Sequence, residues 1–104
     1  MTKEERLKIY DEATQLWGLV AQYDQCIEEM GELIVAINKY KRKVVHGEYA
    51  SNNEIFDNLI EEIADVSMCI EQMKHFVGEE RVEKVLDQKM QKFLGQIEYM
   101  KNKH

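Results

Sequence analysis

The chain of 104 residues is 44% hydrophobic and 33% charged, and it contains five Gly and no Pro. This length suits a single domain over residues 1–104, and the scarcity of turn residues argues against a sheet-rich fold, so we predict an all-α protein. A formal net charge of −6 argues against a surface for nucleic-acid polymers or anionic membranes, because both need concentrated positive charge.

The first predicted helix runs from about Thr2 to Trp17, and Gly18 permits a break after it. The second predicted helix is the longest and runs from Leu19 to about Val45. At ~1.5 Å per residue it is about 40 Å long, more than a small four-helix monomer needs to cover itself, so we expect a subunit interface along it. Its apolar seam recurs at intervals of three and four residues and consists of Val20, Tyr23, Ile27, Met30, Ile34, Ile37, Lys41 and Val44.

A loop is predicted over residues 46–52, followed by a third helix that ends near Val77. Ser51 and Glu54 form a capping-box pattern, which places the start of this helix near Asn52 or Asn53. Gly78 supplies a stop, and residues 79–100 form the fourth predicted helix. The expected architecture is a four-helix bundle with long central helices that associates into a homo-oligomer.

The chain has no apolar run near the ~20 residues that a membrane span requires, and its first residues are charged instead of signal-like, so we expect a cytoplasmic protein without a membrane partner. Cys26 and Cys69 lie in apolar helical segments and match no zinc or redox spacing. We expect them to pack as small hydrophobic side chains, with a buried disulfide as the alternative.

Two pairs of acidic residues lie beside the apolar arcs of the second and third predicted helices. Glu29 and Glu32 form one pair, Glu62 and Asp65 form the other, and each pair has the three-residue spacing that makes side chains neighbours on a helix. Four carboxylates near a core repel one another and lose hydration, so a cation must compensate them. The alternative is that such pairs lie on solvated helix faces, where they are common.

An all-oxygen set of ligands suits Mg²⁺, with Mn²⁺ as a possible substitute, and does not suit zinc. Magnesium also favours phosphate oxygens, which indicates a phosphorylated substrate. A di-iron carboxylate bundle requires Glu-x-x-His on two helices. None of His46, His75 and His104 follows a Glu by three residues, so this chemistry is disfavoured and the histidines are expected in the loop, on the surface and in the tail.

The motifs EExxE (Glu28-Glu29-Met30-Gly31-Glu32) and ExxD (Glu62-Ile63-Ala64-Asp65) resemble those of the MazG-like, all-α nucleoside triphosphate pyrophosphohydrolases. The surrounding stretches LWGLVAQYDQCIEEMGELIVAINKYKR and NLIEEIADVSMCIEQM extend the likeness over most of the chain. The resemblance implies that Glu29, Glu32, Glu62 and Asp65 bind magnesium and carry out the catalysis. It further implies hydrolysis of a nucleoside triphosphate to the monophosphate and pyrophosphate, in the service of nucleotide-pool house-cleaning.

Further contacts with the substrate are predicted for Lys39, Lys43 and Lys89, which can reach phosphates as point charges. Trp17 can stack on a base while Gln22 or Gln25 reads the edge of that base, although a Trp in this position is more often core or interface. Many relatives carry an Asn and an Arg after a Lys on the last helix. Here Phe93 and Gln96 or Ile97 follow Lys89 instead.

Two alternative functions remain open at this stage. One is a non-catalytic helical interaction or regulatory protein of bacterial or phage origin, which uses its acidic face for binding. The other is a dUTP- or phosphoribosyl-ATP-type pyrophosphohydrolase of the same superfamily. In the enzymatic readings the partners are a nucleoside triphosphate and further copies of the chain, as a homodimer or a homotetramer.

Overall fold

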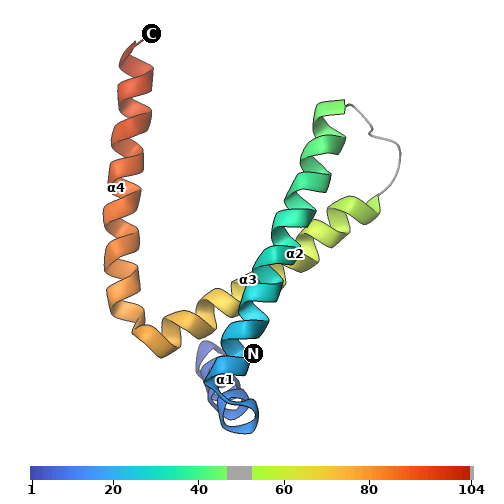
Figure 1. Ribbon diagram of the computed structural model, residues 1–104. Coiled ribbons are helices and arrows are strands. Elements are labelled where there is room, and N and C mark those ends of the chain that lie inside the picture. The colour runs from blue at the N-terminus through green and yellow to red at the C-terminus, as the bar shows by residue number, and fades with distance from the viewer. Residues whose placement is uncertain (47–52, 104) are drawn as a thin grey trace. The chain divides into compact units, whose positions relative to one another are not determined.

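The computed structural model describes residues 1–46 and 53–103, and within these ranges it contains four α-helices and no strand. The prediction of an all-α protein with four helices is therefore confirmed. The predicted capping box at Ser51 and most of the predicted loop lie outside the described residues. The helices are α1 (Lys3–Trp17), α2 (Leu19–His46), α3 (Asn53–Val77) and α4 (Glu79–Lys103) (Figure 1).

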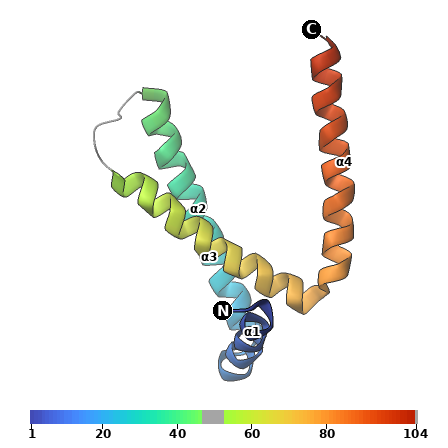
Figure 2. The same ribbon diagram turned by 180° about the vertical axis from the view of Figure 1, so that it is seen from behind.

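The chain divides into two compact units, Met1–Gln72 and Met73–His104. The first unit holds α1, α2 and most of α3, and the second holds the end of α3 and all of α4 (Figure 2). A single domain over residues 1–104 stays a prediction. No helix in the described part of the chain combines the length and the apolar character that crossing a membrane demands.

The helix ends follow local sequence signals. Thr2 and Glu5 form a capping box, in which the backbone N–H of Glu5 donates to Thr2 Oγ1 at 3.2 Å and the backbone N–H of Thr2 donates to Glu5 Oε1 at 3.1 Å. Gly18 and Gly78 end α1 and α3 with φ of 89° and 109°. Side chains with a Cβ rarely adopt positive φ, so glycine permits both breaks.

Helices α2 and α3 run antiparallel within the first unit, as their cross-contacts show. At one end Gln72 Nε2 donates to Gln22 Oε1 at 2.8 Å. At the other end the rings of Tyr40 and Phe56 lie 5.9 Å apart. The small side chains Cys26 and Ala36 of α2 and Cys69 of α3 are buried between these ends, and both cysteines are free thiols. The expected packing role of the cysteines is confirmed, and the disulfide alternative is not observed.

The predicted apolar seam of α2 does not face α3. Val20, Ile27 and Ile34 of this seam are 73%, 67% and 60% exposed, whereas Cys26 and Ala36, on another side of the helix, are 3% and 1% exposed. Because α2 is apolar over most of its circumference, periodicity alone does not select the side that packs. The exposed residues Val20, Ile27 and Ile34 recur every seven residues along one side of α2, and exposed apolar side chains that gather on one side are a feature of interaction sites.

A polar contact fixes α1 to α3. Arg6 donates two hydrogen bonds to Glu71, at 2.7 and 3.0 Å, and the buried Tyr10 donates its hydroxyl to Glu71 Oε1 at 2.7 Å. These hydrogen bonds from Arg6 and then Tyr10 lower the pKa of Glu71 to about 2. Burial, followed by the hydrogen bond to Glu71, raises the pKa of Tyr10 to about 12. The contact holds α1 beside the acidic residues of α2 and α3.

Candidate functional site

Three of the four predicted acidic residues converge where α2 and α3 pack together. Glu29 and Glu32 come from α2 and Glu62 comes from α3, and each offers a carboxylate oxygen within 4.8 Å of the oxygens offered by the other two. Glu29 and Glu62 are half-buried, whereas Glu32 is exposed. We call these three residues the acidic cluster. Two helices that are separate in sequence therefore supply one concentrated negative site.

The fourth predicted residue, Asp65, lies at the edge of this cluster. Its charge contributes to raising the pKa of Glu29, which places the two carboxyl groups close together. Asp65 and Glu29 also line the same cavity. Asp65 follows Glu62 by one helical turn, as Glu32 follows Glu29, so the ExxE and ExxD spacings bring all four acids to one region of the α2–α3 contact.

The surroundings disfavour the charged forms of the half-buried acids. Burial raises the pKa of Glu62, and the charges of Glu32, Glu29 and Asp65 raise it further. Burial also raises the pKa of Glu29, although Gln25 partly opposes this by donating Nε2 to Glu29 Oε1 at 2.8 Å.

Two carboxylate oxygens of the cluster lack a hydrogen-bond partner. Among the described residues, Glu29 Oε2 and Glu62 Oε2 are buried and unpartnered. Buried polar atoms without partners are costly, and neighbouring negative charges add to the cost. A cation placed between these oxygens would give each of them a partner and would neutralise the neighbouring negative charges.

The donor set fits a hard divalent cation. Octahedral Mg²⁺ holds its oxygens at ~2.0–2.1 Å, which places neighbouring ligands about 3 Å apart and opposite ligands about 4.2 Å apart. The oxygens of the acidic cluster lie within 4.8 Å of one another. A shift of each oxygen by roughly 1 Å toward their common centre would therefore let all three coordinate one ion. Glu side chains can make such an adjustment by rotation about their single bonds. Glu29, Glu32 and Glu62 are thus suited to hold Mg²⁺ or Mn²⁺, with Asp65 beside them.

A cavity of about 310 Å³, which we call the Trp17 cavity, adjoins the acidic cluster on the α1 side. It reaches the acids at Glu29 and Asp65, and Trp17 lines it despite being 67% exposed. Gln22 and Gln25, the two alternatives predicted to read the edge of a base, also line it. Its full lining is Ile9, Tyr10, Ala13, Trp17, Gln22, Gln25, Glu29, Asp65, Met68, Cys69 and Gln72.

A second cavity of about 420 Å³, which we call the Lys39 groove, adjoins the acidic cluster on its other flank. It includes Glu32 and Glu62 of the cluster, together with the predicted phosphate contact Lys39. Its lining residues are Glu28, Gly31, Glu32, Val35 and Lys39 of α2 and Asn58 and Glu62 of α3. The acidic cluster therefore lies between two cavities of different character, one aromatic and amide-rich and the other acidic with a single lysine.

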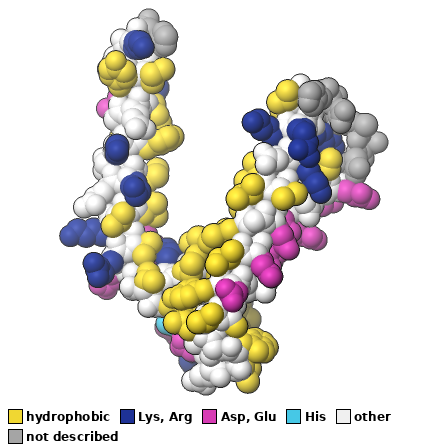
Figure 3. Space-filling view, in the orientation of Figure 1, with side chains coloured by type: hydrophobic (Ala, Val, Ile, Leu, Met, Phe, Trp, Pro, Cys, Tyr) yellow, Lys and Arg dark blue, Asp and Glu magenta, His cyan; other side chains and the backbone are white. Residues whose placement is uncertain are grey.

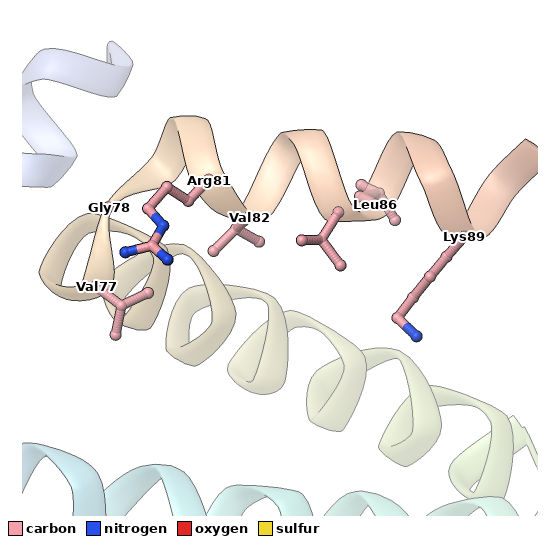
Figure 4. Close-up of a pocket in the computed structure, with 7 residues that line it drawn as sticks. Val77, Gly78, Arg81, Val82, Leu86 and Lys89 are labelled. Atoms are coloured by element: carbon pink, nitrogen blue, oxygen red, sulfur yellow. The ribbon is translucent and has the colours of Figure 1, made fainter.

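The remaining predicted phosphate contacts are placed elsewhere. Lys43 is half-buried and lines neither of these two cavities. Lys89 belongs to the second unit, where it lines a recess of about 550 Å³. Figure 4 shows Arg81 and Lys89 toward the two ends of this recess, with Val82 between them. The roles of Lys43 and Lys89 stay predictions.

Sequence reasoning missed Asn58, Gly31 and Gln72 as lining residues. Asn58 precedes Glu62 by four residues and Gln72 follows Asp65 by seven, so both share a helix face with a predicted ligand. This spacing was a usable signal. Glu28, the first residue of the EExxE motif, is exposed and also lines the Lys39 groove.

Neither a scan of protein-family models nor searches of curated proteins and of solved structures finds a match to this chain. The likeness to MazG-like enzymes therefore rests on the EExxE and ExxD motifs and their surroundings. Any function has to be argued from the chemistry of the site itself, since a fold alone does not specify one.

Proposed function

We propose that the protein is a magnesium-dependent nucleoside triphosphate pyrophosphohydrolase of the MazG-like type, which releases the monophosphate and pyrophosphate. The observation that carries this proposal is the position of the acidic cluster. It has two unpartnered buried oxygens, at Glu29 and Glu62, and lies between a cavity lined by an aromatic residue and amides and a groove that contains a lysine. A metal site beside a cavity lined by an aromatic side chain and amides suits a nucleotide, because the metal ion can bind phosphate oxygens while the aromatic side chain stacks on the base.

When bound, Mg²⁺ supplies charge neutralisation for phosphate oxygens and for the charge that develops during in-line attack. Glu29, Glu32 and Glu62 would hold the ion, with Asp65 as a fourth carboxylate beside the acidic cluster. Water adds across the linkage between the α- and β-phosphates. One new phosphorus–oxygen bond forms, one bridging phosphorus–oxygen bond breaks, and pyrophosphate leaves with the bridging oxygen.

A carboxylate of the cluster accepts the proton of the attacking water. The nucleoside is oriented by Trp17, which stacks on the base, and by Gln22 or Gln25, which hydrogen-bonds to the edge of the base.

The same proposal includes association into a homodimer or homotetramer. The exposed seam residues Val20, Ile27 and Ile34 support it, because a monomer gains nothing from exposing apolar side chains at regular helical spacing. The same surface also favours the second candidate, a non-catalytic helical interaction protein. That candidate predicts no metal dependence and no special effect of substitutions in the acidic cluster.

The test is release of pyrophosphate from a panel of canonical and modified nucleoside triphosphates, dUTP and phosphoribosyl-ATP included, with and without Mg²⁺. Wild type and the matched control Glu61→Gln, which changes an exposed acid next to the cluster, are expected to turn over at least one substrate with Mg²⁺ only. Glu62→Gln is expected to lose at least 100-fold in kcat/KM. Turnover without Mg²⁺, or turnover by Glu62→Gln at the rate of wild type, would contradict the mechanism. The absence of turnover for every substrate in the panel would favour the interaction protein.

A further inference from the structure

Two glutamine side chains on the wall of the Trp17 cavity are held by hydrogen bonds within the protein. Gln22 and Gln25 are three residues apart on α2, so they are neighbours on one face of the helix, and both line the cavity. A glutamine amide has an acceptor end, its oxygen, and a donor end, its nitrogen. The partner inside the protein therefore determines which end is left for a ligand.

Gln22 is held through its oxygen. The buried Gln72 of α3, which is 8% exposed, donates Nε2 to Gln22 Oε1 at 2.8 Å. Gln72 is itself held at its other end, because the thiol of the buried Cys26 donates a weak hydrogen bond to Gln72 Oε1, with Sγ at 3.9 Å. Gln22 consequently has the N–H groups of Nε2 left to offer to a ligand in the cavity.

Gln25 is held through its nitrogen. Its Nε2 donates to Glu29 Oε1 at 2.8 Å. An ionised carboxylate can only accept hydrogen bonds, so this contact keeps the nitrogen of Gln25 toward Glu29 and leaves Oε1 for a ligand. The cavity therefore presents a donor at Gln22 and an acceptor at Gln25.

The two amides differ in their position relative to the acidic cluster. Gln25 contacts Glu29, which belongs to the cluster. Gln22 instead contacts Gln72, about two turns of α3 beyond Asp65. In Figure 3 lysine and arginine side chains gather near the C-terminal end of α2, far along the helix from Gln22. The uncharged base is thus favoured at the Gln22 end, with the part of the base nearer the sugar at Gln25 and its far end at Gln22.

Nucleobases fall into two classes against this pattern. In uracil, thymine, guanine and hypoxanthine a ring N–H donor is followed, farther from the sugar, by a carbonyl acceptor. In cytosine and adenine the same two places hold a ring-nitrogen acceptor and an amino donor. The first class matches Gln25 and Gln22 at both places, whereas the second class matches neither. A mismatch is costly because it leaves polar groups of the site unpaired.

We infer that the Trp17 cavity selects nucleobases in which a ring N–H adjoins a carbonyl group, which are uracil, thymine, guanine and hypoxanthine. Gln22 and Gln25 are the contact residues. Gln72 is a positioning residue, which acts through Gln22 by fixing the end of the amide that meets the base. This inference rests on the proposed function, and it names the class of substrate that the base site accepts.

The experiment titrates nucleoside monophosphates into the full-length protein with Mg²⁺, by calorimetry and by the fluorescence of Trp17, which is the only Trp in the chain. Uridine and cytidine monophosphates form one pair of ligands, and inosine and adenosine monophosphates form the other. The members of each pair differ only at the two places that Gln22 and Gln25 contact. Wild type is expected to bind the uridine or the inosine ligand at least about tenfold more tightly than the other member of its pair.

Substitutions of Gln72 test the positioning role. Gln72→Glu replaces the donor to Gln22 by an acceptor, so Gln22 should turn its oxygen to the base and the preference should fall by about tenfold. Gln72→Leu leaves Gln22 able to turn either way and should also lower the preference, and it avoids burying a charge. Gln88→Leu removes an exposed glutamine of α4 and is the control, with the preference of wild type expected. Circular dichroism and Tm verify that each variant folds.

The possible outcomes separate this inference from the proposed function. Binding of cytidine and adenosine ligands by wild type as tight as that of their partners, or no binding of any ligand, overturns the base assignment even if nucleoside triphosphates are hydrolysed. A preference that both Gln72 variants retain overturns the role of Gln72. A preference that both lose and Gln88→Leu keeps supports the inference even if no triphosphate is hydrolysed, in which case the proposed reaction falls and the base site stands.

Discussion

We expect Glu62→Gln to be more stable than wild type without magnesium and less stable than wild type with magnesium. The raised pKa of Glu62 means that the fold disfavours its ionised form, first because of burial and then because of Glu32, Glu29 and Asp65. A group whose pKa is raised by folding stabilises the protein below its unfolded pKa of 4.5 and loses that contribution as pH rises through its folded pKa. Without a divalent ion, Glu62→Gln should therefore be more stable than wild type at pH 8, and the difference should vanish toward pH 4.

Magnesium should invert this order because the amide carries no charge and is a poorer ligand. An ion present at 100 times its Kd stabilises the fold by about 2.7 kcal/mol, which corresponds to a rise in Tm of roughly 10–20 °C for a domain of this size. Removing one of three converging ligands should weaken binding of the ion by at least the factor of about 10–100 that is typical of losing an outer-shell partner. At 100-fold weaker binding the same ion concentration gives only about 0.4 kcal/mol, or roughly 2–3 °C.

Thermal unfolding followed by circular dichroism measures both effects, at equal protein concentration, with EDTA or with excess Mg²⁺, at pH 8 and pH 5. Glu61→Gln removes the charge of the neighbouring exposed acid and should behave as wild type in all four conditions. Two results would refute the reasoning. One is a Glu62→Gln variant that is less stable than wild type in EDTA at pH 8, and the other is an equal gain from Mg²⁺ in both proteins.

Tyr10→Phe keeps the buried ring but removes the 2.7 Å hydrogen bond to the Glu71 carboxylate. The free energy of unfolding in urea should therefore fall by about 1.5–3 kcal/mol. An unchanged unfolding midpoint would show that this hydrogen bond does not stabilise the fold. Because the pKa of Glu71 is lowered from 4.5 to about 2, its contribution is complete above pH 4.5 and should be lost as pH falls toward 2, which acid titration of wild type against Tyr10→Phe can follow. Trp17→Ala should raise KM for the nucleotide by about 5–100-fold through lost stacking. An unaltered KM would remove Trp17 from the site. Gly18→Ala forces a side chain into φ 89° and should cost about 1–3 kcal/mol, whereas Gly95→Ala, at a helical position with no atom within 4 Å of the new Cβ, should gain about 0.5–1 kcal/mol in the same unfolding assay.

Local signals carried most of the secondary-structure prediction. The boundaries at Gly18 and Gly78 were predictable because few residues other than glycine adopt positive φ at low cost. The choice of Glu29, Glu32, Glu62 and Asp65 was likewise accessible from spacing, since residues three apart are neighbours on any helix. We expected the two pairs to form one metal site, and the structure brings three of the four carboxylates together in the acidic cluster.

Other features depend on contacts between distant residues, which no local pattern encodes. Arg6 and Tyr10 contact Glu71, which lies more than 60 residues later in the chain, and no sequence pattern near either segment predicts this contact. The packing side of α2 is a similar case. Several of its sides are apolar, and only the fit of Cys26 and Ala36 against α3 selects one of them.

The sequence by itself determined four helices, their breaks and four acids at helical spacing, because each of these depends on backbone preference or on the geometry of a single helix. The tertiary structure decided which acids converge, left Glu29 Oε2 and Glu62 Oε2 buried without partners, and placed the Trp17 cavity and the Lys39 groove on opposite flanks of the cluster. The physical reason is that these properties belong to the crossing of two helices. The register and rotation of that crossing are set by side chains from both helices at once.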